Sequence, residues 1–252
     1  MPQYSADGAH VAFQSMRSGS SEIWLANADG SDPVRLTSFN GPLTGAPSWC
    51  SDNRRIAFDS RASGVSAIYV VDVLEGRPHR LDTSHTNLSM PVWSEDCRWI
   101  FGSDGRSRLY RIGAFGGPAE LFTDRPTYKA AVSGRQVVFN VAGQREVELW
   151  AKPTEGGAEY PLPDMPHLSY SDGWTAVPRG IYYTHPDVSA PAVYFYDFES
   201  HQTHPVRTLP EAPAPLGGLG IAVSKDEHWL LYTRDAQWQS DIMILSGFRQ
   251  AR

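Results

Sequence analysis

Residues 47–72 read PSWCSDNRRIAFDSRASGVSAIYVVD, and two short apolar runs in this stretch decide the fold. The first run is Ile56-Ala57-Phe58 and the second is Ile68-Tyr69-Val70, each with one aromatic residue among apolar neighbours. A polar segment with a Ser-Gly pair separates them, and glycine suits a tight turn because it accepts a positive φ. Short apolar and aromatic runs on both sides of such a turn predict two antiparallel β-strands.

The same pattern recurs along the chain. Two apolar residues followed by an aromatic residue return with a mean period of about 44 residues, which is the length of a β-propeller blade. These triplets are Val11-Ala12-Phe13, Ile56-Ala57-Phe58, Trp99-Ile100-Phe101, Val137-Val138-Phe139, Ile181-Tyr182-Tyr183 and Leu230-Leu231-Tyr232. A second column follows them at Trp24, Tyr69, Tyr110, Trp150, Tyr194 and Met243, and a leucine column ends most units at Leu36, Leu81, Leu121, Leu162 and Leu209.

Each unit holds four short antiparallel strands, here called A to D from the axis outward. The units are too short and too rich in turn residues for helices. The chain is therefore expected to be an all-β, six-bladed propeller of four-stranded antiparallel blades, forming a single domain over residues 1–252. The expected blades cover approximately residues 2–39, 47–83, 91–123, 130–163, 174–210 and 220–248.

The last blade is expected to be three-stranded. In the first four units the leucine follows the second column by 11 or 12 residues, so after Met243 it would fall near position 255, beyond Arg252. We expect Asp241–Leu245 to be an exposed edge, and residues upstream of Met1 in a longer protein to supply the fourth strand. Because an unpaired edge invites intermolecular pairing, an edge-mediated dimer is also expected.

Composition and charge exclude several classes of protein. The chain of 252 residues carries a formal net charge of −6 and no basic run, so direct nucleic acid binding is not expected. No apolar run is long enough for membrane insertion. Cys50 and Cys97 have no CxxC spacing and give no disulfide framework, so two small, half-buried residues are expected.

Blades one to three resemble the repeat of TolB-like propellers. The resemblance rests on Pro47-Ser-Trp49-Cys-Ser-Asp52, Ile56-Ala-Phe58-Asp-Ser60-Arg61 and Ile68-Tyr69-Val70. The odd fifth blade, with Gly173-Trp174, and the ending Ser240-Asp-Ile-Met-Ile244 are similar to the C-terminal propeller of bacterial winged-helix (CadC-like) transcriptional regulators. This resemblance implies a noncatalytic sensing or protein-contact module. The winged helix itself is absent from these residues.

No sequence motif indicates catalysis, a cofactor or a metal. The sequence lacks a P-loop, a G-x-S-x-G elbow and an H-E-x-x-H motif, so an enzyme is not expected. His201 and His204 are expected to lie in a solvated hairpin, and Asn27–Asp32 in an ordinary turn rather than a calcium loop. Among the tryptophans, Trp174 and Trp238 lie outside the repeat columns, and Trp238 is a candidate contact residue.

A ligand or protein partner is expected at one mouth of the central channel. The loops between strand D of one blade and strand A of the next converge there and are the longest in the chain. Their polar and aromatic residues suit a peptide or a neutral ligand. The candidates are Asn40, His85, Asn87, Arg125, Tyr128, His167 and Tyr170.

Three functional contexts remain open from the sequence. The leading expectation is a noncatalytic binding or sensing module attached to a bacterial transcriptional regulator. The alternatives are a free-standing periplasmic TolB-like binding protein and the accessory propeller of a hydrolase. The expected location is cytoplasmic for the isolated chain, and periplasmic if the full-length protein carries an upstream transmembrane helix or signal peptide.

Overall fold

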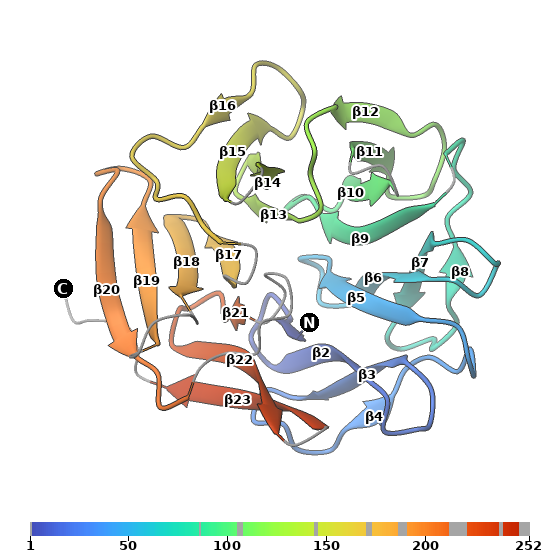
Figure 1. Ribbon diagram of the computed structural model, residues 1–252. Coiled ribbons are helices and arrows are strands. Elements are labelled where there is room, and N and C mark those ends of the chain that lie inside the picture. Colours follow the sequence, from blue (N-terminus) through green and yellow to red (C-terminus); the bar gives the residue numbers. More distant parts are fainter. Residues whose placement is uncertain are drawn as a thin grey trace.

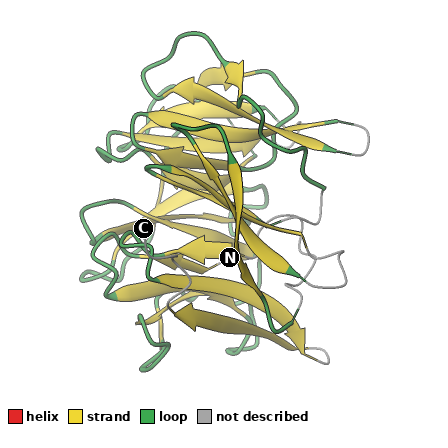
Figure 2. Ribbon diagram, turned by 90° about the vertical axis from the view of Figure 1, so that its left-hand side faces the viewer, coloured by secondary structure: helices red, strands yellow, loops and turns green. Residues whose placement is uncertain are grey.

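The computed structural model of the chain describes residues 2–85, 87–104, 108–143, 146–169, 173–185, 191–211, 221–236 and 239–246. Within these residues the secondary structure consists of strands grouped in six antiparallel sheets, without a helix. Figure 1 shows the sheets arranged as blades around a central axis, and Figure 2 shows them stacked side by side. The six-bladed propeller expected from the sequence is confirmed.

The strands of each blade follow one another from the axis outward in chain order. Blades one to three consist of β1 (Pro2–Tyr4), β2 (His10–Ser15), β3 (Glu22–Asn27) and β4 (Val34–Arg35); β5 (Thr44–Trp49), β6 (Arg55–Ser60), β7 (Ala67–Asp72) and β8 (His79–Arg80); β9 (Leu88–Trp93), β10 (Trp99–Asp104), β11 (Leu109–Gly113) and β12 (Glu120–Thr123). Blades four to six consist of β13 (Ala130–Ser133), β14 (Gln136–Ala142), β15 (Val147–Pro153) and β16 (Tyr160–Pro161); β17 (Trp174–Val177), β18 (Gly180–His185), β19 (Ala192–Asp197) and β20 (Thr203–Thr208); β21 (Ile221–Val223), β22 (Trp229–Ala236) and β23 (Gln239–Ser246).

The innermost strands close a ring around the axis. Each contacts the innermost strands of both neighbouring blades, in the order β1, β5, β9, β13, β17, β21 and back to β1. These strands are short, at three to six residues, and the ring brings parts of all six blades to one place in the molecule. A site on the axis is therefore assembled from residues far apart in the sequence.

The hydrophobic core lies in the seams between blades. A sheet buries both of its faces only when neighbours cover them, and each blade is covered by the next. In the seam between blades one and two, Ile23 and Leu36 pack with Phe58 and Tyr69. Phe58 is completely buried, and its ring stacks on Tyr69 with centroids 5.7 Å apart. The triplet and leucine columns thus supply side chains to the seam.

Blade three departs from the leucine column. Leu121 is 53% exposed, whereas the next residue, Phe122, is buried with its ring centroid 4.8 Å from that of Phe101. The pairing of β11 with β12 shifts register between Leu109 and Tyr110. Because neighbouring residues of a strand face opposite sides, a shift of one residue exchanges the buried side chain. Phe122 therefore fills this seam, in place of Leu121 from the leucine column.

The turns between strands A and B repeat one hydrogen-bonded design. The hydroxyl of Ser5 donates to Asp7 at 2.6 Å, and the equivalent Ser94 donates to Asp96 at 2.6 Å. The aspartate then accepts a backbone N–H further along the turn. The small residues that end strand A, such as Ser5 and Ser94, are buried and hold these turns.

A disulfide between Cys50 and Cys97 joins two of these turns. The sequence interpretation, which gave no disulfide, is therefore wrong. The two sulfurs are bonded, with Cα atoms 5.5 Å apart. Cys50 takes the serine position of the turn in blade two, and Cys97 takes the left-handed position in blade three with a φ of 55°. Gly8 and Asn53 fill that left-handed position in the first two blades. A separation of 47 residues is close to one blade period, so the cysteines meet in adjacent turns.

Two further sequence expectations have clear outcomes. Strands β5 and β9 begin at Thr44 and Leu88, three residues before the expected starts of blades two and three. Blade six is three-stranded in the order β21-β22-β23, as predicted, and its expected edge, Asp241–Leu245, lies within the outermost strand β23.

Candidate functional site: the central cavity

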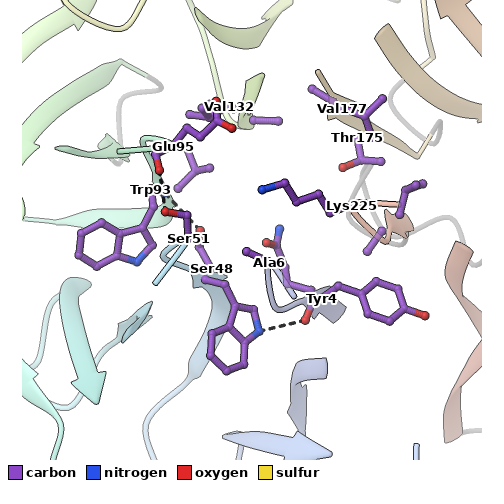
Figure 3. Close-up of a pocket in the computed structure, with 18 of the residues that line it drawn as sticks. Tyr4, Ala6, Ser48, Ser51, Trp93, Glu95, Val132, Thr175, Val177 and Lys225 are labelled. Atoms are coloured by element: carbon purple, nitrogen blue, oxygen red, sulfur yellow. Dashed lines mark hydrogen bonds between the residues drawn. The ribbon is translucent and has the colours of Figure 1, made fainter. Parts of the chain in front are cut away.

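A cavity of about 230 Å³ lies on the propeller axis. All six innermost strands line it, together with the first residues of the A–B turns, among them Ala6, Ser51 and Lys225. Figure 3 shows these side chains arranged around a common space. The lining is mixed, since alanine, valine and proline alternate with serine, threonine and three charged residues. Such a mixture of apolar surface with a few polar groups is typical of a binding site.

Three charged residues give the cavity its electrostatic character. Glu95 and Lys225 come from the exposed A–B turns of blades three and six, and Lys129 comes from the buried start of strand A in blade four. Figure 3 shows Glu95 and Lys225 on opposing sides of the cavity. A ligand that reaches between them meets one anionic and one cationic side chain.

Lys129 is the most constrained of the three. Its side chain is only 4% exposed, its ammonium donates to the backbone carbonyl of Trp174, and the Nζ atom lies 4.5 Å from the centroid of that indole ring. Burial lowers the pKa of Lys129 to about 7, because the charged form loses its hydration. The indole face favours the cation, but desolvation is the larger effect.

Three serine hydroxyls that line the cavity are engaged in structure. Ser5 and Ser94 donate to the aspartates of their turns, and Ser51 donates to the carbonyl of Glu95 at 2.7 Å. The described lining contains no histidine beside these hydroxyls. Activation of a serine requires a base within hydrogen-bonding reach, whereas Ser5 and Ser94 donate to Asp7 and Asp96, which hold the turns.

The cavity wall contains two residues in the left-handed region. Ala46 has a φ of 50° and Met90 a φ of 56°, and each lies where the inner pair of strands shifts register. The backbone N–H of Met90 donates to the carboxylate of Asp59 at 2.7 Å. Burial raises the pKa of Asp59 to about 6. Neither position is a glycine, so both residues carry backbone strain in the wall of the cavity.

The six predicted loop residues that the structure describes do not line this cavity. Asn40 is exposed, and its backbone N–H donates to the buried carboxylate of Glu22 at 2.8 Å. His85 stacks on Tyr110 with centroids 4.2 Å apart. Asn87 is exposed with a φ of 65°. These residues mainly support their own blades, and a role in binding stays a prediction for them.

The remaining candidates lie around blade four. The guanidinium of Arg125 lies 3.6 Å from the ring centroid of Trp150 and pairs with Glu159. Tyr128 is half-buried and packs beside the core of blades four and five. His167 is exposed, with its Nδ1 atom 2.7 Å from a carboxylate oxygen of Glu146. The seventh candidate, Tyr170, lies outside the described residues.

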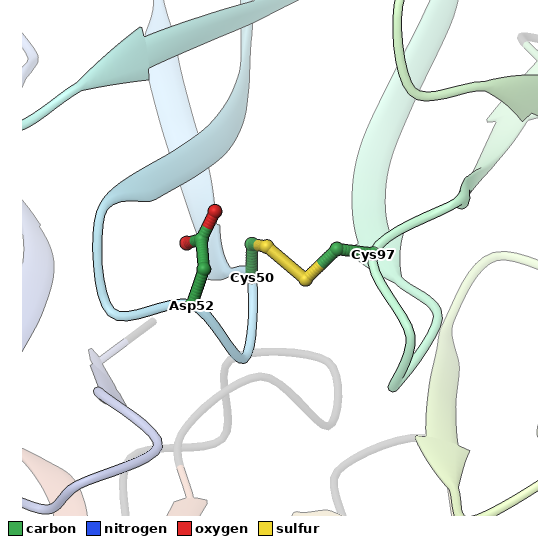
Figure 4. A group of neighbouring side chains, drawn as sticks. All are labelled: Cys50, Asp52 and Cys97. Carbon is green, nitrogen blue, oxygen red and sulfur yellow. A yellow bond between two sulfur atoms is a disulfide. The ribbon is translucent and has the colours of Figure 1, made fainter.

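The tryptophans and possible ligand clusters complete the comparison with the sequence. Trp174 is buried, being only 1% exposed, and Trp238 lies outside the described residues. Within the described chain, the one group with metal-ligand chemistry is Cys50, Asp52 and Cys97 (Figure 4). Its two sulfurs are consumed by the disulfide, and so the group does not offer a set of thiolate ligands.

The repeat and its turns find their counterpart in one protein family. The model of the family described as the TolB beta propeller domain matches residues 1–167. The chain belongs to this TolB-like propeller family. Of the solved structures, TolB from Acinetobacter baumannii superimposes with a TM-score of 0.75 at 16% identity, over 94% of this chain and 61% of that one. The TolB-like chain thus spans about three-fifths of that protein.

Other solved structures share the fold. A putative TolB from Agrobacterium tumefaciens matches with a TM-score of 0.69 at 15% identity, over 86% of this chain and 81% of the other. An oligogalacturonate lyase from Vibrio parahaemolyticus matches with a TM-score of 0.64 at 13% identity, over 96% and 88%. No curated protein matches the sequence. Within the described residues, no helix combines the length and hydropathy needed to cross a bilayer.

The sequence did not single out the cavity residues. Lys129, Glu95 and Lys225 carry no motif, because they become neighbours only when six blades close into a ring. The signal that was available is positional: each lies at the start of strand A or just after its end. In a propeller these positions face the axis, so charged residues there are the ones to examine.

Proposed function

We propose that this TolB-like propeller is a noncatalytic module whose partner inserts a peptide segment or small ligand into the central cavity. The observation that carries the proposal is the assembly of Glu95, Lys129 and Lys225 around one cavity lined by all six blades. The hydroxyls of Ser5, Ser51 and Ser94 in the lining hold turns, which supports binding rather than catalysis. The resemblance of the sequence to winged-helix regulators supports a sensing role within a bacterial transcriptional regulator.

The disulfide supports a location for this module. Bonds of this kind form and persist in oxidising compartments and are rare in the cytosol. Cys50 and Cys97 are both buried at the turns of neighbouring blades, which limits access of reductants. We therefore place the propeller on the periplasmic side of a bacterial envelope, attached to a regulator or, as a second candidate, acting as a free-standing TolB-like binding protein.

Site-specific photo-crosslinking tests the cavity as the binding site. A photoreactive phenylalanine analogue replaces Ala6 or Lys225 at the turn-side mouth, in the full-length protein expressed in its own host. The matched control carries the same analogue at exposed Leu74, in the C–D turn of blade two. We expect adducts from the two mouth positions only. Equal labelling at Leu74, or no adduct from the mouth, contradicts the proposal.

Thiol trapping tests the compartment separately. Cells are quenched in acid, denatured and treated with a maleimide of high mass, with and without prior reduction. We expect both cysteines to react only after reduction. Labelling without a reductant would show that the thiols are free in the cell, and would contradict the periplasmic placement without touching the cavity.

A further inference from the structure

The seam between blades six and one contains a second cavity, of about 420 Å³. From blade one it is lined by residues of β2 and β3 and their turns, and from blade six by Leu231, Met243 and Ile244. It lies away from the propeller axis, because β23 is the outermost strand of its blade. The central binding site therefore does not account for it.

The other seams show what this one lacks. In each of them the outer strand of one blade, or the loop directly after it, contributes an apolar side chain to the packing against the next blade. These residues are Leu36, Leu81, Phe122, Leu162 and Leu209. In the cluster between blades six and one, the side chains of blade six that the structure describes contribute Ala222 and Leu231, from the two inner strands. Among the described residues, no strand lies outside β23.

The backbone edge of β23 matches edges that are paired elsewhere. In blades one, two and four, the backbone N–H of the leucine that ends the unit donates to a carbonyl of the third strand. The acceptor is the residue just before the second-column aromatic, as when Leu36 donates to Ile23 at 2.8 Å. The equivalent residue of β23 is Ile242, which pairs with Thr233 of β22 on its other side. By the alternation of an antiparallel ladder, Ile242 and Ile244 direct their N–H and C=O groups to the outer edge.

Charge at the rim of the seam defines a direction for an incoming strand. Arg17 follows β2 and Asp29 follows β3, so the two lie at opposite ends of blade one. Because β23 is equivalent to β3, a strand antiparallel to β23 starts at the Asp29 end and finishes at the Arg17 end. A basic residue near its start and an acidic residue near its finish would complement these side chains.

We propose that the outer edge of β23 and this cavity bind an extended strand of a partner polypeptide, antiparallel to β23. The strand carries a leucine-sized side chain for the cavity, preceded by a basic residue and followed by an acidic one. It extends the existing interface between blades six and one and completes a four-stranded blade, which is strand addition to an open sheet edge. The outer strand of blade two carries the same pattern in its Arg80-Leu81-Asp82 segment.

A synthetic peptide with the sequence of residues 77–84, RPHRLDTS, is therefore the probe. Its affinity for the chain is measured by fluorescence anisotropy, and hydrogen exchange locates the contact. We expect binding with new protection of the amides of β23. A peptide with Leu81→Asp should bind at least tenfold more weakly, and one with Arg80 and Asp82 exchanged should bind several-fold more weakly.

Variants of the chain complete the test. Ile244→Pro removes an outward N–H and should weaken peptide binding at least tenfold, whereas Ala28→Phe fills the cavity and should do the same without changing the edge. Arg35→Pro is the matched control, because the N–H of Arg35 faces away from β3 on the outer edge of a complete blade. Lys225→Ala, at the central cavity, should leave peptide binding unchanged.

Several outcomes overturn the proposal. Equal affinity for the Leu81→Asp peptide would show that no apolar side chain of the peptide is recognised by the cavity. Protection confined to the innermost strands would move the contact to the central cavity. A dimer of the chain that protects β23 and is not displaced by the peptide would show that a second copy is the occupant. If crosslinking shows no partner in the central cavity, in contrast, these measurements of peptide binding to β23 are unaffected.

Discussion

The two seams that flank blade one are built from the same sequence columns and differ by one strand. On the side of blade two, Leu36 follows β4 and closes the packing around Phe58. On the side of blade six, the equivalent ring Phe13 lines a cavity of about 420 Å³. The comparison shows that inner strands suffice to form the ring, whereas the fourth strand determines how well a seam is filled.

Truncating equivalent rings gives the largest contrast between the two seams. Phe58 is completely buried, so Phe58→Ala should destabilise the chain by roughly 3–5 kcal/mol through lost transfer energy and a new void. Phe13→Ala enlarges a space that already exists and should cost roughly half as much. Urea denaturation at one pH measures both. Equal losses would mean that the two seams are packed alike. Asn87→Ala, on an exposed loop, should cost only about 1 kcal/mol, because alanine tolerates the φ of 65° less well than asparagine.

The disulfide adds a covalent link to a closed seam, the one between blades two and three. It ties the turns of blades two and three across 47 residues, and removing such a link costs roughly 2–4 kcal/mol, chiefly because the unfolded chain gains freedom. Cys97→Ser should therefore lower the denaturation midpoint, and a reductant should lower that of the native protein by a similar amount. Cys97→Ser should no longer respond to the reductant; a continued response would place the effect elsewhere.

Asp59 adds a pH dependence to the same side of the ring. Its pKa is raised by burial from 3.8 to about 6, so folding favours the protonated form, and its contribution to stability falls as the pH rises from about 4 to about 6. Asp59→Asn should remove this loss and stabilise the chain by up to about 3 kcal/mol at pH 8. At pH 3.5 the gain should vanish.

Denaturation of Asp59→Asn and the native protein across this pH range supplies the measurement. A gain of equal size at both ends would assign the effect to packing rather than to ionisation. The amide retains an oxygen that can accept the N–H of Met90, so the wall of the central cavity is preserved in the variant.

The smallest effect is expected at the open seam itself. Ile244 is 38% exposed, so Ile244→Ala should cost less than about 1 kcal/mol. At the closed seam, Leu36→Ala removes a packed side chain and should cost about 2 kcal/mol. If a bound strand covers Ile244, the cost of Ile244→Ala should rise toward that of Leu36→Ala in its presence. No change on saturation with the peptide would leave the seam uncovered.

Periodicity was enough to predict the blades because each repeat buries the same positions against the next. The triplet column that contains Phe58 and the second column that contains Tyr69 therefore predicted the strands, the number of blades and the three-stranded last blade. Leu121 escaped this reasoning, because a one-residue shift in pairing is decided by local ladder geometry. The cysteine pair escaped it as well: its spacing of one blade period becomes a bond only if neighbouring turns lie close together.

The sequence by itself determined the family, the strand order and the apolar columns that supply most of the seams. These depend on local alternation and on a repeat that each blade carries within about 44 residues. The closed ring decided the rest. It brought Glu95, Lys129 and Lys225 to one cavity, joined Cys50 to Cys97, and left the six described loop candidates outside the cavity lining. Such contacts join residues one or more blades apart, and their geometry exists only after all six blades have assembled.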